Sequence, residues 1–177
     1  MATGAAKRYA EAVFGLARES GRFDEWQRDL DMLATLLNDP AAASVLASPK
    51  ISRSQKLSLL NGALDGGQQE AVNLATILLD RGRIAIAPEI AEVFRDAVLA
   101  ERGIAIAHVT TAVPIDQEAE DAIKQRLSDL VGKQVEIRAQ VDESIIGGIV
   151  ARIGDQLIDG SVSNQLRRLR DRLAAGA

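Results

Sequence analysis

The stretch that decides the fold of the second half of the chain is VDESIIGGIVARIGDQLIDGSVSNQLRRLRDRL, residues 141–173. It contains two apolar runs, GIVARI and QLID, which are separated by Gly154-Asp155. Glycine in the first turn position supplies the positive φ that a tight turn requires, so these runs predict a β-hairpin. Residues 161–173 predict a helix, because apolar residues recur there at helical spacing. These residues are Val162, Leu166, Leu169 and Leu173.

Two other features of this stretch allow a functional and a structural interpretation. The other side of the last helix carries Arg167, Arg168, Arg170 and Arg172, which could in principle clamp phosphate or RNA. No Tyr, Phe or Trp follows Gly103, so no side chain is available to stack on a base. This favours a helix that faces a protein partner or solvent. Gly147-Gly148 precedes a predicted strand rather than a helix, which favours a bulge or a close backbone approach over an anion cradle.

The residues just before this stretch complete a small α/β domain. Alternation of apolar and polar residues over 135–141 predicts a strand with one exposed face. A helix is expected over about 116–131, with Gly132 ending it, and the run IAIAHVTTAV at 104–113 predicts another strand. Acidic residues cluster in the first turn of that helix, at Asp116, Glu118, Glu120 and Asp121. Capping and the helix dipole explain them better than a metal or an acid-base pair.

Residues 1–103 show helical periodicity throughout and predict six short helices that pack as a bundle. Helix starts are expected near Asp24, where Gln27 completes an apparent capping box, and at Asp39-Pro40. Further starts are expected at Ser52, with Gln55 three residues on, and at Pro88. The sequence therefore predicts an α+β protein, with a helical domain at 1–103 and an α/β domain at 104–177.

Composition excludes several classes of function. The 177 residues include no cysteine and one histidine, His108, so thiolate metal sites are excluded and other metal sites are disfavoured. The net charge of −4 argues against broad nucleic-acid binding. The longest stretch without a charged residue, Gly103 to Ile115, is far shorter than the roughly 20 residues of a spanning helix. No nucleotide-binding glycine motif and no targeting peptide is expected. We therefore expect no cofactor and no catalytic residues.

The chain resembles the delta subunit of bacterial F-type ATP synthases, the counterpart of the mitochondrial oligomycin-sensitivity-conferring protein. The resemblance is carried mainly by residues 141–173. Its landmarks there are Asp142, Ser144, Gly147-Gly148, Gly154-Asp155 and Asp159-Gly160-Ser161. Upstream landmarks are YAEAVFGLA at 9–17, Leu46 with Ser48-Pro49, residues 80–83, Pro88-Glu89-Ile90 and residues 109–114. Thr111 stands where the family often has Ser.

The resemblance implies a non-catalytic stator subunit with a six-helix domain and a smaller α/β domain. Such a subunit links the catalytic head to the peripheral stalk, so that the head resists the torque of the rotor during proton-driven ATP synthesis. It implies that a groove between the first and fifth helices binds the N-terminal helix of an alpha subunit, and that the second domain holds the stalk b subunits. It also implies a peripheral location on the cytoplasmic face of the bacterial membrane, through the complex alone, without homo-oligomers.

Combined with the apolar stripes, the resemblance gives a set of expected partner-binding residues. For the alpha subunit these are Tyr9, Ala12, Val13, Leu16, Ala75, Leu78 and Leu79, and for the b subunits Leu166, Arg167, Arg168, Leu169 and Arg170. The small side chains of the first helix leave room for a second helix to lie close. The main alternative is a soluble two-domain adaptor that binds another amphipathic helix. A small hydrolase that uses the acidic turn near Asp116 is a weaker third hypothesis.

Overall fold

The computed structural model describes residues 2–175, apart from the side chains of residues 169 and 172–175. Contacts between residues divide the chain into two compact units, Met1–Val98 and Leu99–Ala177. This division falls within the last helix of the first unit, a few residues before Gly103. The helix and the next segment are joined at this point, because the Ile104 N–H donates to the Leu99 carbonyl at 2.9 Å while Gly103 adopts a positive φ of 72°.

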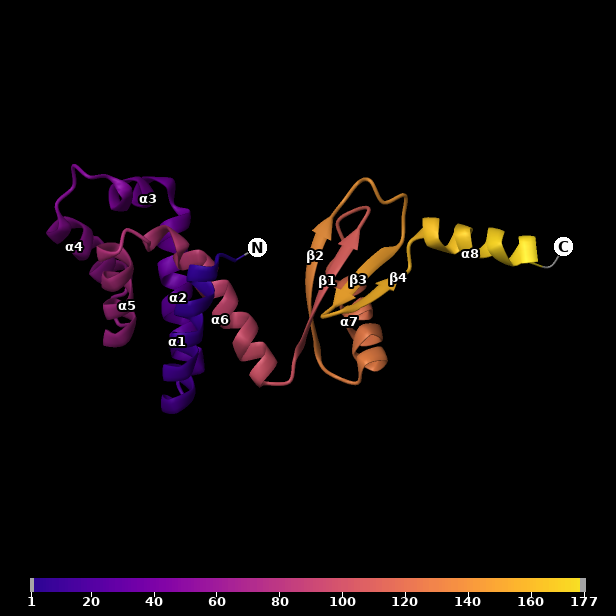
Figure 1. Cartoon of the computed structure of the whole chain (residues 1–177), viewed down its shortest axis with the longest axis horizontal. Helices are drawn as coiled ribbons and strands as arrows, with labels where there is room; N and C mark the ends of the chain where they lie inside the picture. The colour runs from indigo at the N-terminus through magenta and orange to yellow at the C-terminus, as the bar shows by residue number, and fades with distance from the viewer. Residues whose placement is uncertain (1, 176–177) are drawn as a thin grey trace. The chain divides into compact units, whose positions relative to one another are not determined.

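The first unit contains α-helices and one short 3-10 helix (Figure 1). The α-helices are α1 (Gly4–Ser20), α2 (Phe23–Asn38), α3 (Pro40–Ala47), α4 (Arg53–Ala63), α5 (Gln69–Asp80) and α6 (Ala87–Glu101). The 3-10 helix η1 (Ile84–Ile86) precedes α6 and was not predicted from the sequence.

Three of the four predicted helix starts agree with the structure. The Asp39 side chain accepts hydrogen bonds from the Ala41 and Ala42 N–H groups, and Pro40 is the first helical residue. Ser52 and Gln55 form a complete capping box. Helix α6 begins at Ala87, one residue before Pro88.

The capping box predicted for Asp24 and Gln27 is wrong. Helix α2 begins at Phe23, so Asp24 already lies within its first turn, and the N-cap position is occupied by Arg22 without a side-chain cap. The Gln27 side chain is engaged elsewhere, because its Nε2 donates to Asp31 Oδ1 at 3.0 Å. A favourable carboxylate at the helix N-terminus does not need to be the cap itself.

The core of the first unit is built from aliphatic side chains around Trp26, which is 1% exposed, and Phe94, which is fully buried. Helix α1 contributes its most buried residues at spacings of three or four. They are Ala6, Ala10, Val13 and Ala17. The buried face of α1 includes Val13 but leaves Ala12 and Leu16, two other predicted partner-binding residues of this helix, exposed.

A buried carboxylate fixes the start of α5. Asp29 of α2 is 1% exposed, and its Oδ2 accepts hydrogen bonds from the Gln68 N–H at 2.8 Å and from Gln68 Nε2 at 3.3 Å. A Cβ at Gly67 would lie 3.0 Å from Asp29 Oδ1 and 3.0 Å from the Leu64 carbonyl oxygen, so a larger residue would crowd the carboxylate. The connection from α4 to α5 is thus held to α2 by one buried side chain.

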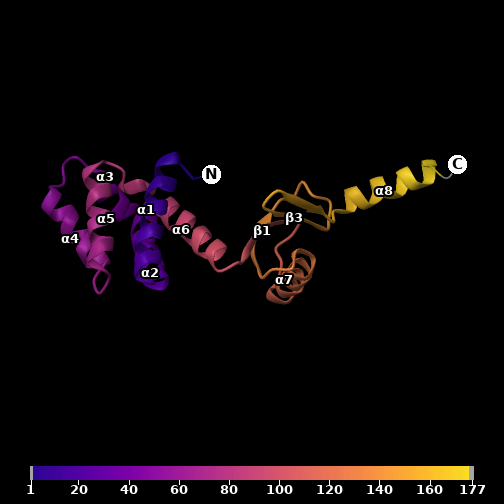
Figure 2. The ribbon, with the colours of Figure 1, turned by 60° about the horizontal axis from the view of Figure 1, so that its bottom comes forward.

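The second unit is a four-stranded sheet with one covering helix, followed by a terminal helix (Figures 1 and 2). Its elements are β1 (Ala105–Thr111), α7 (Gln117–Val131), β2 (Val135–Val141), β3 (Ile149–Ile153), β4 (Gln156–Asp159) and α8 (Val162–Ala175). The strand order is β2-β1-β3-β4, with β1 parallel to β2 and antiparallel to β3. The α+β fold class is confirmed, and so is the hairpin at Gly154, where φ is 56°.

Helix α7 covers one face of the sheet (Figure 2), and Leu127, which is 4% exposed, packs there against Ala107 and Val135. As predicted, α7 ends at Gly132, while Asp116 is its N-cap and accepts from the Ala119 N–H at 2.8 Å. The opposite face presents the row Arg138, His108, Arg152 and Leu157, in register across the strands. Both cores are separate, since the buried clusters of the two units share no residue.

Candidate partner-binding surfaces

Helix α1 has a second, accessible apolar face beside its buried one. Leu16 is 50% exposed, Ala12 is exposed and Tyr9 is half-buried. These residues recur at spacings of three and four, so they lie on one stripe of the helix. Val13 belongs to the core, at 2% exposure, and its side chain offers no surface to a partner in this conformation.

The predicted residues of α5 are mostly interior. Ala75 and Leu78 are fully buried, and Leu79 is half-buried and packs against the core. The large exposed apolar residue of α5 is instead Ile77, which is 49% exposed and which the predicted set omits. The sequence could have indicated Ile77 as a contact residue, because it is a large apolar residue that lies outside the buried stripe of α5. That stripe consists of Ala71, Leu74, Ala75 and Leu78.

An ion pair indicates which side of α5 faces the turn between α1 and α2. Arg22, just after α1, contacts Glu70 of α5 with 2.8 Å between Nη2 and Oε1. Ile77 lies seven residues after Glu70, which is two turns, and so lies on the same side of α5. Leu79 lies nine residues after Glu70, on the far side. We group the accessible residues of α1 with Ile77 as the candidate surface of the first unit and call it the α1–α5 surface: Tyr9, Ala12, Leu16 and Ile77.

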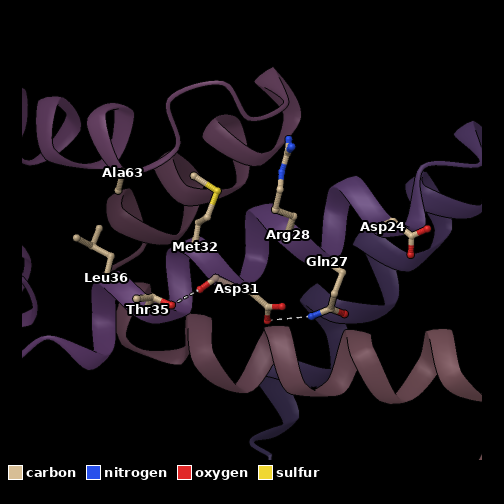
Figure 3. A pocket seen from close by; sticks show the side chains of 8 residues that line it. All are labelled: Asp24, Gln27, Arg28, Asp31, Met32, Thr35, Leu36 and Ala63. Carbon is tan, nitrogen blue, oxygen red and sulfur yellow. Dashed lines mark hydrogen bonds between the residues drawn. The ribbon is translucent and has the colours of Figure 1, made fainter.

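A hollow of about 710 Å³ lies along α2, between it and the end of α4 at Ala63 (Figure 3). Its polar side chains bond to each other and to neighbours. Asp31 Oδ1 accepts from Gln27 Nε2 at 3.0 Å and from Arg95 Nη2 at 2.8 Å, and Thr35 Oγ1 donates to the Asp31 carbonyl at 2.8 Å. Of these three bonds, the Arg95–Asp31 bond joins α6 to α2 and the other two lie within α2, and none of them indicates a ligand.

Helix α8 is the candidate surface of the second unit, and it extends away from the sheet in both views (Figures 1 and 2). Leu166 is 58% exposed and Val162 is 37% exposed, while Arg167, Arg168 and Arg170 are exposed. Arg170 Nη2 lies 3.0 Å from Asp171 Oδ1. The side chain of Leu169 lies outside the described part of the chain. The structure therefore brings together Leu166 and the arginines on one accessible helix.

The glycine pair at 147–148 explains how α8 is attached. Gly148 has a φ of 82°, and a Cβ there would lie 2.5 Å from the Gly160 carbonyl oxygen. The Gly147 carbonyl accepts from the Val162 N–H at 3.0 Å, and the Ile149 carbonyl accepts from the Gly160 N–H at 2.9 Å. The predicted close backbone approach is confirmed. It joins the segment before β3 directly to the start of α8.

Two carboxylates stabilise the turns next to this connection between β3 and α8. Asp142 Oδ1 accepts from the Ser144 N–H at 2.9 Å, and Asp159 Oδ1 accepts from the Ser161 N–H at 2.9 Å. Hydrogen bonding from Ser144 lowers the pKa of Asp142, and hydrogen bonding from Ser161, with a smaller effect of Arg167 and Arg168, lowers the pKa of Asp159. Both side chains are therefore ionised at neutral pH and hold the turns on either side of the hairpin.

We expect Gly148→Ala to destabilise the second unit strongly. The new Cβ must occupy a position 2.5 Å from the Gly160 oxygen and a left-handed backbone conformation, which together cost about 2 kcal/mol or more. The matched control is Gly154→Ala, which has a positive φ but no atom within 4 Å of the new Cβ. Urea unfolding followed by circular dichroism measures both. Equal losses of unfolding free energy in the two variants would contradict the role of the close approach.

Neither a metal-binding group nor a membrane-spanning helix is found within residues 2–175. Histidine and carboxylate side chains in this range form no group of three that could hold a metal. No helix of the same range is both long and apolar enough to cross a bilayer. The prominent surfaces are instead an apolar stripe on a helical unit and a basic amphipathic helix on an α+β unit. Exposed apolar surfaces of this kind are common sites of protein–protein contact.

Comparisons with known proteins specify the family. The family described as ATP synthase delta (OSCP) subunit matches residues 5–173. The ATP synthase subunit delta of Thioalkalivibrio sulfidiphilus is 35% identical over 170 residues, covering 96% of each chain. That of Dehalococcoides mccartyi is 36% identical over 171 residues, covering 97% of this chain and 94% of the relative.

The fold comparison agrees with this assignment. A chain in the cryo-EM structure of the Toxoplasma gondii mitochondrial ATP synthase hexamer superposes with a TM-score of 0.69, at 24% identity, and covers 97% of this chain. The chain belongs to the ATP synthase delta (OSCP) subunit family. The family resemblance seen in residues 141–173 is confirmed, and with it the assignment as a peripheral-stalk component of an ATP synthase.

Proposed function

We propose that this subunit is a non-catalytic link that joins the catalytic head of the synthase to the peripheral stalk, and so resists the torque of the rotor. The observation that carries the proposal is the separation of the chain into two units with independent cores, each with its own exposed apolar surface. Two separate attachment sites on one chain are what a mechanical connector needs. No cofactor is required for this role.

The first attachment is to the N-terminal helix of an alpha subunit. It uses the α1–α5 surface, where an incoming helix can cover Leu16 and Ile77, each about half exposed. Ala12 allows close approach, because its side chain is small. Val13, Ala75 and Leu78 support this surface from the core side rather than touching the partner, and Leu79 packs against the core on the far side of α5. Attachment at nanomolar affinity corresponds to about 12 kcal/mol.

The second attachment is to the b subunits of the stalk, through α8. Its exposed Leu166 and the basic side chains of Arg167, Arg168 and Arg170 fit an apolar and acidic partner helix. In a bacterium the subunit then lies peripherally on the cytoplasmic side of the membrane, held by the complex. No homo-oligomer is needed, because the two surfaces bind different partners.

Co-purification tests this function against that of an adaptor for unrelated helices. A tagged form of the chain, expressed in cells with an intact synthase, is expected to recover alpha and b subunits together after detergent extraction. Recovery of neither subunit, with the tagged protein folded, would contradict the stator function. Recovery of alpha without b would support the first attachment and contradict the second.

A further inference from the structure

Three exposed apolar side chains lie at one end of the sheet, where β1 and β2 end and β3 begins (Figure 1). Val113 is 65% exposed, Val141 is 45% exposed and Ile146 is 78% exposed. Val141 is paired with Thr111, the last residue of β1, while Val113 and Ile146 belong to the turns that follow β1 and precede β3. We call Val113, Val141 and Ile146 the sheet-end patch. Exposed apolar side chains that share one end of a folded unit are typical of a contact surface.

Hydrogen bonds hold both turns of the sheet-end patch in place. The Asp142 N–H donates to the Thr111 carbonyl at 2.9 Å, which joins the turn after β2 to the end of β1. Thr111 Oγ1 donates to the Val113 carbonyl at 2.8 Å. In the other turn, the Ile145 N–H donates to the Asp142 carbonyl at 3.1 Å. The apolar side chains therefore extend from a fixed backbone, so a partner that covers them orders the turns at little entropic cost.

The charged residues beside the sheet-end patch are all acidic. Residues 112–118 include Asp116 and Glu118, residues 141–148 include Asp142 and Glu143, and neither segment contains a lysine or an arginine. All four carboxylate side chains are exposed. Because complementary charge favours association, the fitting occupant is a segment that presents an apolar side chain between basic residues.

This acidic rim discriminates among the available partners. The b segment that fits α8 is itself acidic, so like-charge repulsion disfavours it here. An anionic membrane surface is disfavoured for the same reason. A second copy of the chain offers its basic α8, but such a head-to-tail contact leaves both surfaces open at the ends and extends into a polymer. The catalytic head is the remaining partner that the proposed function supplies.

We propose that the sheet-end patch binds a basic segment of the catalytic head, which covers Val113 and Ile146 with an apolar side chain and places its cations beside Glu143. The inference rests on the proposed function, because that function supplies the head as a partner. It gives the second unit a contact of its own with the head, in addition to the α1–α5 surface. Attachment through both units raises the overall affinity for the head, because the second contact forms within an existing complex.

The absence of cysteine from the chain allows a direct test. Ile146→Cys and the control Leu157→Cys each introduce the only thiol of the chain, and Leu157 is 66% exposed on β4, opposite Arg152 of β3. Labelling with a fluorescent maleimide is timed in the free protein, with soluble b, and in purified synthase that contains the variant. We expect the synthase to slow labelling of Ile146→Cys at least about tenfold and soluble b to change it less than about twofold, because thiol reactivity follows exposure. Labelling of Leu157→Cys is expected to stay within about twofold in all three samples.

A charge reversal tests the chemistry of the occupant. Glu143→Lys, combined with Ile146→Cys, is expected to reduce the slowing in the synthase at least about threefold, measured against the same variant in free form, because it repels a basic segment. Asp129→Lys is the matched control, since it reverses an exposed carboxylate near the other end of α7. It should leave the slowing unchanged. Undiminished slowing in the Glu143→Lys protein would contradict a basic occupant.

The outcomes separate this inference from the proposed function. If Ile146→Cys in the synthase is labelled as fast as in the free protein, or if both thiols are slowed equally, the sheet-end patch is not a specific contact, while the stator function stands. Slowing by soluble b alone would assign the patch to the stalk and contradict the inference. Slowing that grows with the concentration of the free protein would assign it to a second copy instead. A synthase that is recovered without the chain would contradict the proposed function itself.

Discussion

Ala12→Arg is expected to weaken binding of the alpha N-terminal peptide about 30-fold, which corresponds to about 2 kcal/mol. Ala12 lies on the exposed stripe of α1 with Tyr9 and Leu16, where an incoming helix must pack closely. A long charged side chain there must either be desolvated or hold the helix away. Titration calorimetry with the full-length protein and the synthetic peptide measures the effect.

The control for this variant is Ala47→Arg, which makes the same substitution at an exposed alanine at the end of α3. Its affinity for the peptide is expected to match that of the wild type. Trp26 serves as a folding reporter, because it is buried in the core of the first unit and its emission changes when that core opens. A folded Ala12→Arg protein with undiminished affinity would place Ala12 outside the contact.

The sequence predicted where the helices of the first unit lie more accurately than which of their faces is buried. Capping residues such as Asp39 and Ser52 act locally, so their sequence positions mark helix starts directly. The face of α1 is different, because alanines dominate it and two stripes of similar hydrophobicity compete. Only the packed structure shows that Ala6 and Ala10 face the core and that Leu16 does not.

In the second unit, the strands and α7 were predictable from the sequence. The alternation of apolar and polar residues marks the strands, and the residues at the helix ends, Asp116 and Gly132, agree with it in marking α7. The glycine pair at 147–148 signalled a close approach, but not its partner. That partner, the Gly160 carbonyl, lies twelve residues further along the chain and becomes a neighbour only once the hairpin forms. The apolar groove lined by Leu130, Ile149 and Ile158 was not predictable for the same reason, since α7, β3, β4 and α8 each contribute to it.

Removing everything after Gly103 is expected to abolish b binding while keeping alpha-peptide binding within about twofold of wild type. The shortened chain retains all members of the first hydrophobic core, which extends from Ala6 to Val98 and includes no residue of the second unit. Roughly a hundred residues with such a core are enough for independent folding. Calorimetry with the alpha peptide and pull-down with soluble b measure the two activities on the same preparation.

A full-length protein with Arg167, Arg168 and Arg170 all changed to Glu completes this experiment, because it keeps both folded units and alters only exposed side chains. It is expected to lose most of its affinity for b at low salt. The difference from wild type should shrink as salt is raised, since exposed charges are screened beyond about 8 to 10 Å near physiological ionic strength. The truncated protein, in contrast, should fail to bind b at every salt concentration. Full b binding by the truncated protein would mean that the helical unit holds both partners, and the assignment of one partner to each unit would be wrong.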